Sequence, residues 1–129
     1  MKIKILILTA ILIFNGCRDQ SELSMERGEY YYSVDRFEDA VLEYTRVINS
    51  YPDDLSSFNS HTIEMIANAH HNLSVIMFKR GYKSEDKVEK KLYLNKAYSN
   101  AAKAYDLIPK DTYKKTWDKI QKTISTIDS

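Results

Sequence analysis

Turn-forming residues and cysteine are scarce in this chain, and each scarcity excludes a class of fold. Only 3 glycines and 2 prolines occur in 129 residues, too few for the many tight turns of a β-sandwich or a β-barrel. The single cysteine permits neither an internal disulfide framework nor a zinc site built from several cysteines. Lysine, glutamate, alanine and leucine are abundant instead, which favours helices. We therefore expect an all-α protein, and its length leaves room for one domain or a short repeat array.

An excess of one charge is also missing, because 19 lysines and arginines stand against 18 aspartates and glutamates. The formal net charge of +1 gives no basic footprint, so we expect no nucleic acid among the partners. The charges are nevertheless segregated: residues 17–78 hold 4 basic and 11 acidic side chains, whereas residues 79–129 hold 13 basic and 7 acidic ones. This polarity has two interpretations, namely ordinary solvated helix faces, or contacts with a partner or a second copy of complementary charge.

Motifs that carry catalysis or bind metals are missing too. The sequence has no nucleophile elbow, no glycine-rich phosphate loop and no HExxH segment. His70 and His71 are neighbours, so on a helix they point about 100° apart, and His61 lies nine residues before His70. These histidines do not form a set of metal ligands. We expect a protein that is not an enzyme and that uses no metal and no cofactor.

No apolar run is long enough to cross a bilayer as a helix. The longest, Ile5–Phe14, has 10 residues, and a span needs about 20. Lys2 and Lys4 precede this run, and Asn15, Gly16 and Cys17 follow it. A basic start, a short apolar segment and a small residue are typical of a signal peptide, which we expect over residues 1–16.

The position of the only cysteine, directly after a small residue at the end of the apolar run, resembles the lipobox of bacterial lipoproteins. The resemblance implies cleavage before Cys17, attachment of diacylglycerol to its sulfur, further acylation with fatty acids such as palmitate, and a short tether over residues 17–20. It implies a lipid-anchored domain outside the cytoplasm, periplasmic if two membranes are present, and it leaves inner or outer membrane open. The alternative is an ordinary secreted or buried cysteine after an unrelated signal.

Hydrophobic periodicity and helix-breaking residues divide the remainder, residues 21–129, into helical stretches. We expect helices at about 22–34, 36–50, 60–80, 85–107 and 112–127. Asp35 and Ser84 are candidate N-caps, and Gly81 suits a left-handed C-cap of the third helix. Pro52 and Pro109 end the second and fourth helices, because proline cannot continue the hydrogen-bond ladder.

An internal repeat emerges when the two prolines are aligned. The spacings 4, 3 and 5 occur twice, in Ala40, Tyr44, Val47 and Pro52 and in Ala97, Ala101, Ala104 and Pro109. Together with Gly28 and Tyr31 upstream, the first unit, residues 21–54, resembles the tetratricopeptide repeat, a helix-turn-helix of 34 residues. The resemblance implies antiparallel helix pairs in about two repeats, the second elongated, with a last helix that caps the core through Tyr113, Trp117 and Ile120.

The resemblance also implies a concave surface, lined by the first helix of each pair, that binds segments of partner proteins. The expected groove residues are Glu22, Met25, Glu26, Glu29, Tyr32, Asn68, His71, Asn72, Val75 and Phe78. Because acidic side chains stand beside apolar ones, we expect a basic or amphipathic ligand segment. The expected function is a membrane-anchored scaffold that helps to assemble or position a complex of envelope proteins. The alternative is a self-associating structural subunit, a homo-oligomer.

Overall fold

The computed structural model describes residues 19–129, and these residues form five α-helices and no strand. The helices are α2 (Gln20–Ser33), α3 (Phe37–Asn49), α4 (Ser60–Lys83), α5 (Lys87–Leu107) and α6 (Asp111–Ile127). The all-α class is confirmed, and each helix lies within a few residues of the range expected from the sequence. The predicted signal peptide and Cys17 lie outside the described residues.

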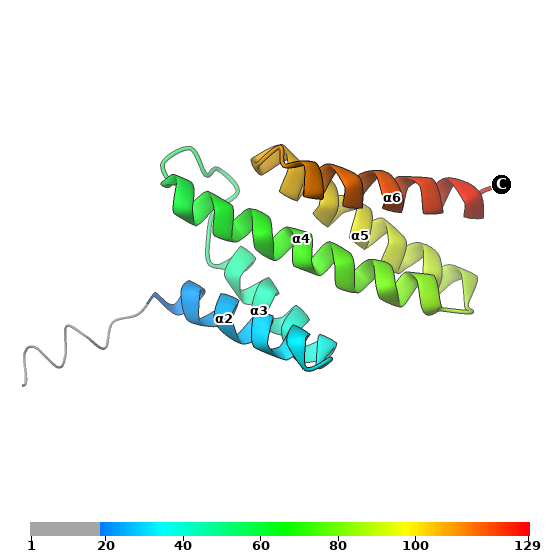
Figure 1. The fold of residues 1–129 in the computed structure, drawn as a ribbon, viewed down its shortest axis with the longest axis horizontal. Helices are drawn as coiled ribbons and strands as arrows, with labels where there is room; N and C mark the ends of the chain where they lie inside the picture. The colour runs from blue at the N-terminus through cyan, green and yellow to red at the C-terminus, as the bar shows by residue number, and fades with distance from the viewer. Residues whose placement is uncertain (1–18) are drawn as a thin grey trace, which may run out of the picture.

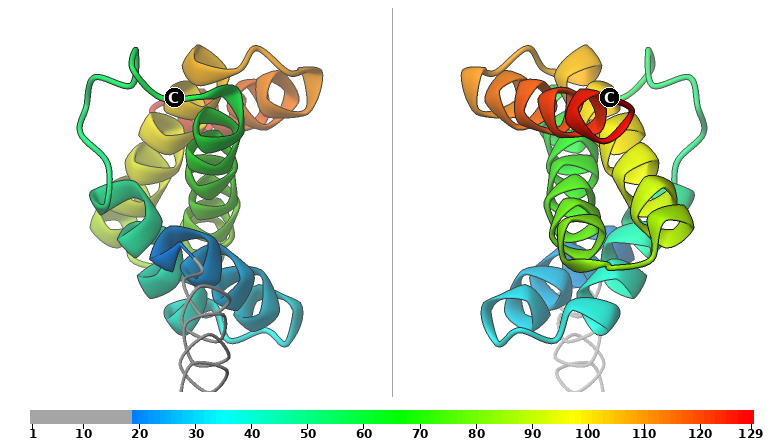
Figure 2. Two further views of the ribbon diagram at one scale, coloured as in Figure 1. Left: turned by 90° about the vertical axis from the view of Figure 1, so that its left-hand side faces the viewer. Right: turned by 90° about the vertical axis from the view of Figure 1, so that its right-hand side faces the viewer.

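Each helix packs against the next one in the sequence, and α4 also touches α2 and α6 (Figure 1). Figure 2 shows α2, α4 and α6 around one side of the molecule, with α3 and α5 on the other side of α4. Because α4 contacts all four other helices, it is the central element of the fold.

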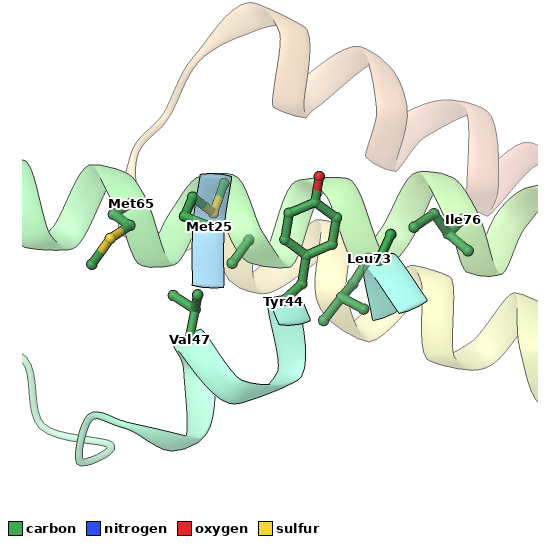
Figure 3. Close-up of a cluster of buried hydrophobic side chains, with 8 residues drawn as sticks. Met25, Tyr44, Val47, Met65, Leu73 and Ile76 are labelled. Atoms are coloured by element: carbon green, nitrogen blue, oxygen red, sulfur yellow. The ribbon is translucent and has the colours of Figure 1, made fainter. Parts of the chain in front are cut away.

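The core runs along both sides of α4. Between α2, α3 and α4 it contains Met25, Tyr44, Val47, Met65, Leu73 and Ile76 (Figure 3). Towards α5 and α6 it is built from small residues against larger ones, with Ala97 and Ala101 under Ile120 and with Ala67 and Ala104 under Tyr113. The alanines predicted to allow close helix packing, Ala40, Ala97, Ala101 and Ala104, are fully buried. Their prediction as core residues is confirmed.

Both described glycines mark places where two helices nearly touch. A Cβ atom on Gly28 would lie 2.6 Å from Cε1 of Tyr44, and one on Gly81 would lie 2.9 Å from Cγ of Leu94. The predicted left-handed cap at Gly81 is wrong, because α4 continues to Lys83 and neither glycine has a positive φ. Gly81 instead gives α5 the room to approach α4.

The helix caps also differ from those expected. Asp35 does not cap α3, because it occupies the α2–α3 turn with φ 60°, and the N-cap, Arg36, makes no side-chain cap hydrogen bond. Asp86 caps α5 by accepting a hydrogen bond of 2.8 Å from the Glu89 backbone N–H. Ser84, the expected N-cap of α5, is instead the C-cap of α4, and its hydroxyl donates to the Glu89 carboxylate at 2.7 Å.

Candidate functional site

An open cavity of about 400 Å³ lies between α2 and α4, next to the start of α6. We call it the α2–α4 groove and define it by its lining residues, which are Glu22, Met25, Glu26, Glu29, His61, Glu64, Met65, Asn68 and Lys110. The helices that supply these residues, α2, α4 and α6, surround one side of the molecule (Figure 2).

Helical periodicity brings these side chains together. Positions i, i+3, i+4 and i+7 share one face of a helix. The residues at this spacing are Glu22, Met25, Glu26 and Glu29 on α2, and His61, Glu64, Met65 and Asn68 on α4. Lys110 joins them as the N-cap of α6, with its ammonium 5.5 Å from the centre of the Tyr113 ring.

The groove has an apolar floor and an acidic rim. Met25 and Met65, which are 7% and 9% exposed, belong to the core and form the floor (Figure 3). The rim carries four carboxylates against one lysine and one histidine, and the His61 ring contacts Glu22 at 3.3 Å between Nε2 and Oε1. Methionine side chains adapt to ligands of different shape, and clustered carboxylates attract cations. The site therefore suits a ligand that combines apolar and basic groups.

The groove contains half of the residues expected from the sequence. It brings together Glu22, Met25, Glu26, Glu29 and Asn68. The others, Tyr32, His71, Asn72, Val75 and Phe78, are half-buried and do not line it.

Tyr32 and Asn72 take part in contacts near the α2–α3 hairpin. The Tyr32 ring packs edge-on against Phe37, with 5.6 Å between ring centres, and its hydroxyl accepts a hydrogen bond of 3.1 Å from Lys79. The Asn72 side chain acts on the hydroxyl of Tyr44. Burial raises the pKa of that Tyr44 hydroxyl to about 12, and the Asn72 hydrogen bond offsets part of the rise.

His71 and Phe78 meet α6 instead of open solvent. Nε2 of His71 lies 3.0 Å from Oγ1 of Thr116, and its ring lies 4.7 Å from that of Tyr113. Because the Thr116 hydroxyl donates to the Thr112 carbonyl, His71 is the donor to Thr116. Phe78 packs against the core cluster of Ile120, under the Lys119 ammonium at 5.1 Å from the ring centre.

The two adjacent histidines are structural. Burial lowers the pKa of His70, and the nearby Lys103 charge acts in the same direction, while burial also lowers the pKa of His71. His70 donates from Nδ1 to Oδ1 of Asn100 over 2.8 Å and so ties α4 to α5. Within residues 19–129, no three histidine, cysteine, aspartate or glutamate side chains are grouped as metal ligands would be.

Four groove residues were missed by the sequence analysis: His61, Glu64, Met65 and Lys110. The first three lie one and two helical turns before Asn68, so the same periodicity applied further back along α4 would have found them. Lys110 carries no such signal, because its place depends on how α6 packs.

A second open cavity, of about 750 Å³, lies between α5 and α6. Tyr98, Tyr105 and Trp117 form its aromatic walls, and Lys103 and Asp106 also line it. Because the charges at its edge have both signs, its lining selects no class of ligand as clearly as the α2–α4 groove does.

No family model, no curated protein and no solved structure matches this chain. Among the helices of residues 19–129, none combines the length and the hydropathy that a membrane span requires.

Proposed function

We propose that this chain is a lipid-anchored interaction scaffold of the bacterial cell envelope, which helps to assemble or position a complex of envelope proteins. The observation that carries the proposal is the α2–α4 groove, with its methionine floor and its four rim carboxylates. Its ligand is a basic or amphipathic segment of a partner protein.

A tetratricopeptide-like organisation supports this function. In the proposed assignment α2 and α3 form one repeat, α4 and α5 form a second, elongated repeat, and α6 is the cap. The matched positions Tyr44 and Ala101, and likewise Val47 and Ala104, are all at most 1% exposed. The first helices of the two proposed pairs, α2 and α4, supply all the groove residues except Lys110.

The proposed anchor would hold the groove at the membrane. Two residues, Arg18 and Asp19, separate Cys17 from the start of α2 at Gln20, a tether of roughly 10 Å when extended. Glu22 of the groove lies two residues further on. The partner segment would therefore be one that is accessible within a short distance of the bilayer surface.

The function is tested by photocrosslinking in cells from two positions of the full chain. One photoreactive residue replaces the exposed Glu64 at the groove rim, and the control replaces Leu42, which is 52% exposed on α3. We expect one dominant envelope protein to be captured from the groove position and not from the control. Capture should fall when Glu29→Lys is added, because the charge reversal repels a basic segment.

Equal capture from both positions, or capture indifferent to Glu29→Lys and to added salt, would count against a groove that selects basic ligands. The anchor is tested separately by Cys17→Ser. This variant should lose incorporation of labelled palmitate and leave the membrane fraction.

A further inference from the structure

The start of α5 carries the most exposed aliphatic side chain of residues 19–129 together with a group of lysines. Val88 is 80% exposed, and Leu92, one helical turn later, is 52% exposed. Lys87, Lys90 and Lys91 surround them in the sequence. The one acidic residue of this segment, Glu89, already accepts a hydrogen bond of 2.7 Å from Ser84. The segment is therefore an amphipathic basic helix start.

This segment has the chemistry that the α2–α4 groove suits. Val88 and Leu92 match the apolar floor of Met25 and Met65, and the lysines match the rim carboxylates. From this complementarity we infer that the α2–α4 groove binds the start of α5 (residues 87–92) of a second copy of this chain.

The partner must be a second copy, because the two surfaces lie at opposite ends of α4. Glu64 belongs to the groove, and Lys83 ends α4 just before the turn to α5. These residues are 19 positions apart, or roughly 30 Å along a helix. Figure 1 shows the α4–α5 turn at the far end of α4 from its start. The start of α5 therefore cannot reach the groove of its own copy.

Such a contact joins different surfaces of the two copies. Each pair leaves one groove and one α5 start unoccupied, so further copies add head to tail. The inference rests on the groove of the proposed function. It adds that self-contact and a partner segment compete for that groove.

The direct test is zero-length carbodiimide crosslinking of the full chain, which couples lysines to carboxylates in direct contact. A mixture of ¹⁴N-labelled and ¹⁵N-labelled protein distinguishes links between copies from links within one copy. We expect mixed-isotope links that join residues 87–91 to Glu29 or Glu64. Absence of such links at all concentrations overturns the inference.

Matched variants test the specificity of the contact. Leu92→Asp should lower the yield of these links roughly tenfold, as loss of an anchoring side chain does. Leu42→Asp is the control, because Leu42 is also 52% exposed but lies on α3 outside the groove. Each variant's melting curve by circular dichroism shows whether it is folded. Equal loss in both folded variants, or links that persist in Leu92→Asp, would overturn the inference.

Charge exchange separates this contact from general electrostatic attraction. Lys87→Glu with Lys90→Glu should abolish the links, as should Glu29→Lys with Glu64→Lys, and the chain with all four changes should regain them. Failure to regain them overturns the inference. If copies do not link but the groove still captures a partner sensitive to Glu29→Lys, the self-contact fails and the proposed function stands. If neither is observed, both fail.

Discussion

Replacing Gly28 by alanine measures how closely α2 approaches α3. In an exposed helix, alanine in place of glycine stabilises by about 1 kcal/mol. In this fold the new Cβ would lie 2.6 Å from Cε1 and 2.8 Å from Cδ1 of Tyr44. Carbon atoms attract best at about 3.5–4.0 Å, so the ring would have to move by about 1 Å. Tyr44 is only 1% exposed, so its ring is enclosed by the protein interior.

The expected result is a net loss of stability. Overpacking a close-packed core costs about 1–3 kcal/mol, which outweighs the gain in helix propensity. We predict that Gly28→Ala lowers the free energy of unfolding by about 1–2 kcal/mol, measured by urea denaturation followed by circular dichroism.

A double-mutant cycle isolates the contact. Tyr44→Val removes the ring and costs on the order of 2–4 kcal/mol by itself. In that background Gly28→Ala should stabilise by about 1 kcal/mol, since only the helix propensity remains. The sign of the alanine effect thus reverses between backgrounds, with an interaction energy of about 2–3 kcal/mol. An alanine that stabilises the protein in both backgrounds would refute the close approach of α2 and Tyr44.

Two further predictions concern α4 and α6. Burial lowers the pKa of His70 and His71, so the folded protein favours the neutral form of both rings. Their contribution to the free energy of unfolding is fully present above about pH 6.5, the pKa of an unfolded histidine. It is lost as the pH falls below that value towards the lower pKa of the folded state. The urea midpoint, measured as a function of pH, should therefore fall as the pH drops below about 6.5, and the fall should be shallower in His70→Gln and in His71→Gln than in the unchanged protein; equal slopes in all three proteins would refute this cause. Trp117, half-buried between Tyr98 and Tyr105, has a buried indole N–H without an acceptor within residues 19–129. In the same assay, Trp117→Ala should lower the free energy of unfolding by about 3 kcal/mol, and Trp117→Phe should lower it by less than about 1.5 kcal/mol. An unchanged urea midpoint for Trp117→Ala would mean that the indole adds no packing energy.

Periodicity was sufficient to find the helices and their buried faces. The repeated spacing around Tyr44 and Ala101 picked out fully buried positions, because a residue in an amphipathic helix is buried by its register alone. Gly81 was misread for a physical reason: a glycine near a helix end suits a left-handed cap, but it equally permits close contact with another helix. Only the packing of Leu94 decides between these roles.

Some of the residues predicted for a binding groove line the α2–α4 groove for a similar reason. The α2 side of the groove followed from helix register, and so did Asn68 on α4. The first turns of α4 were overlooked because the long second unit made the alignment of its start ambiguous. The cover that α6 places on His71 and Phe78, and the position of Lys110, depend on contacts between helices that no local pattern encodes.

The lengths of the connections have a consequence for how fast this chain folds. The α2–α3, α4–α5 and α5–α6 connections each contain three residues, and only the α3–α4 connection, residues 50–59, is longer. Closing short loops costs little chain entropy, and contacts between successive helices give a low contact order. Folding in microseconds to milliseconds is typical of such topologies. Helices α4, α5 and α6 can therefore assemble by local steps, and docking of the α2–α3 hairpin onto α4 completes the groove.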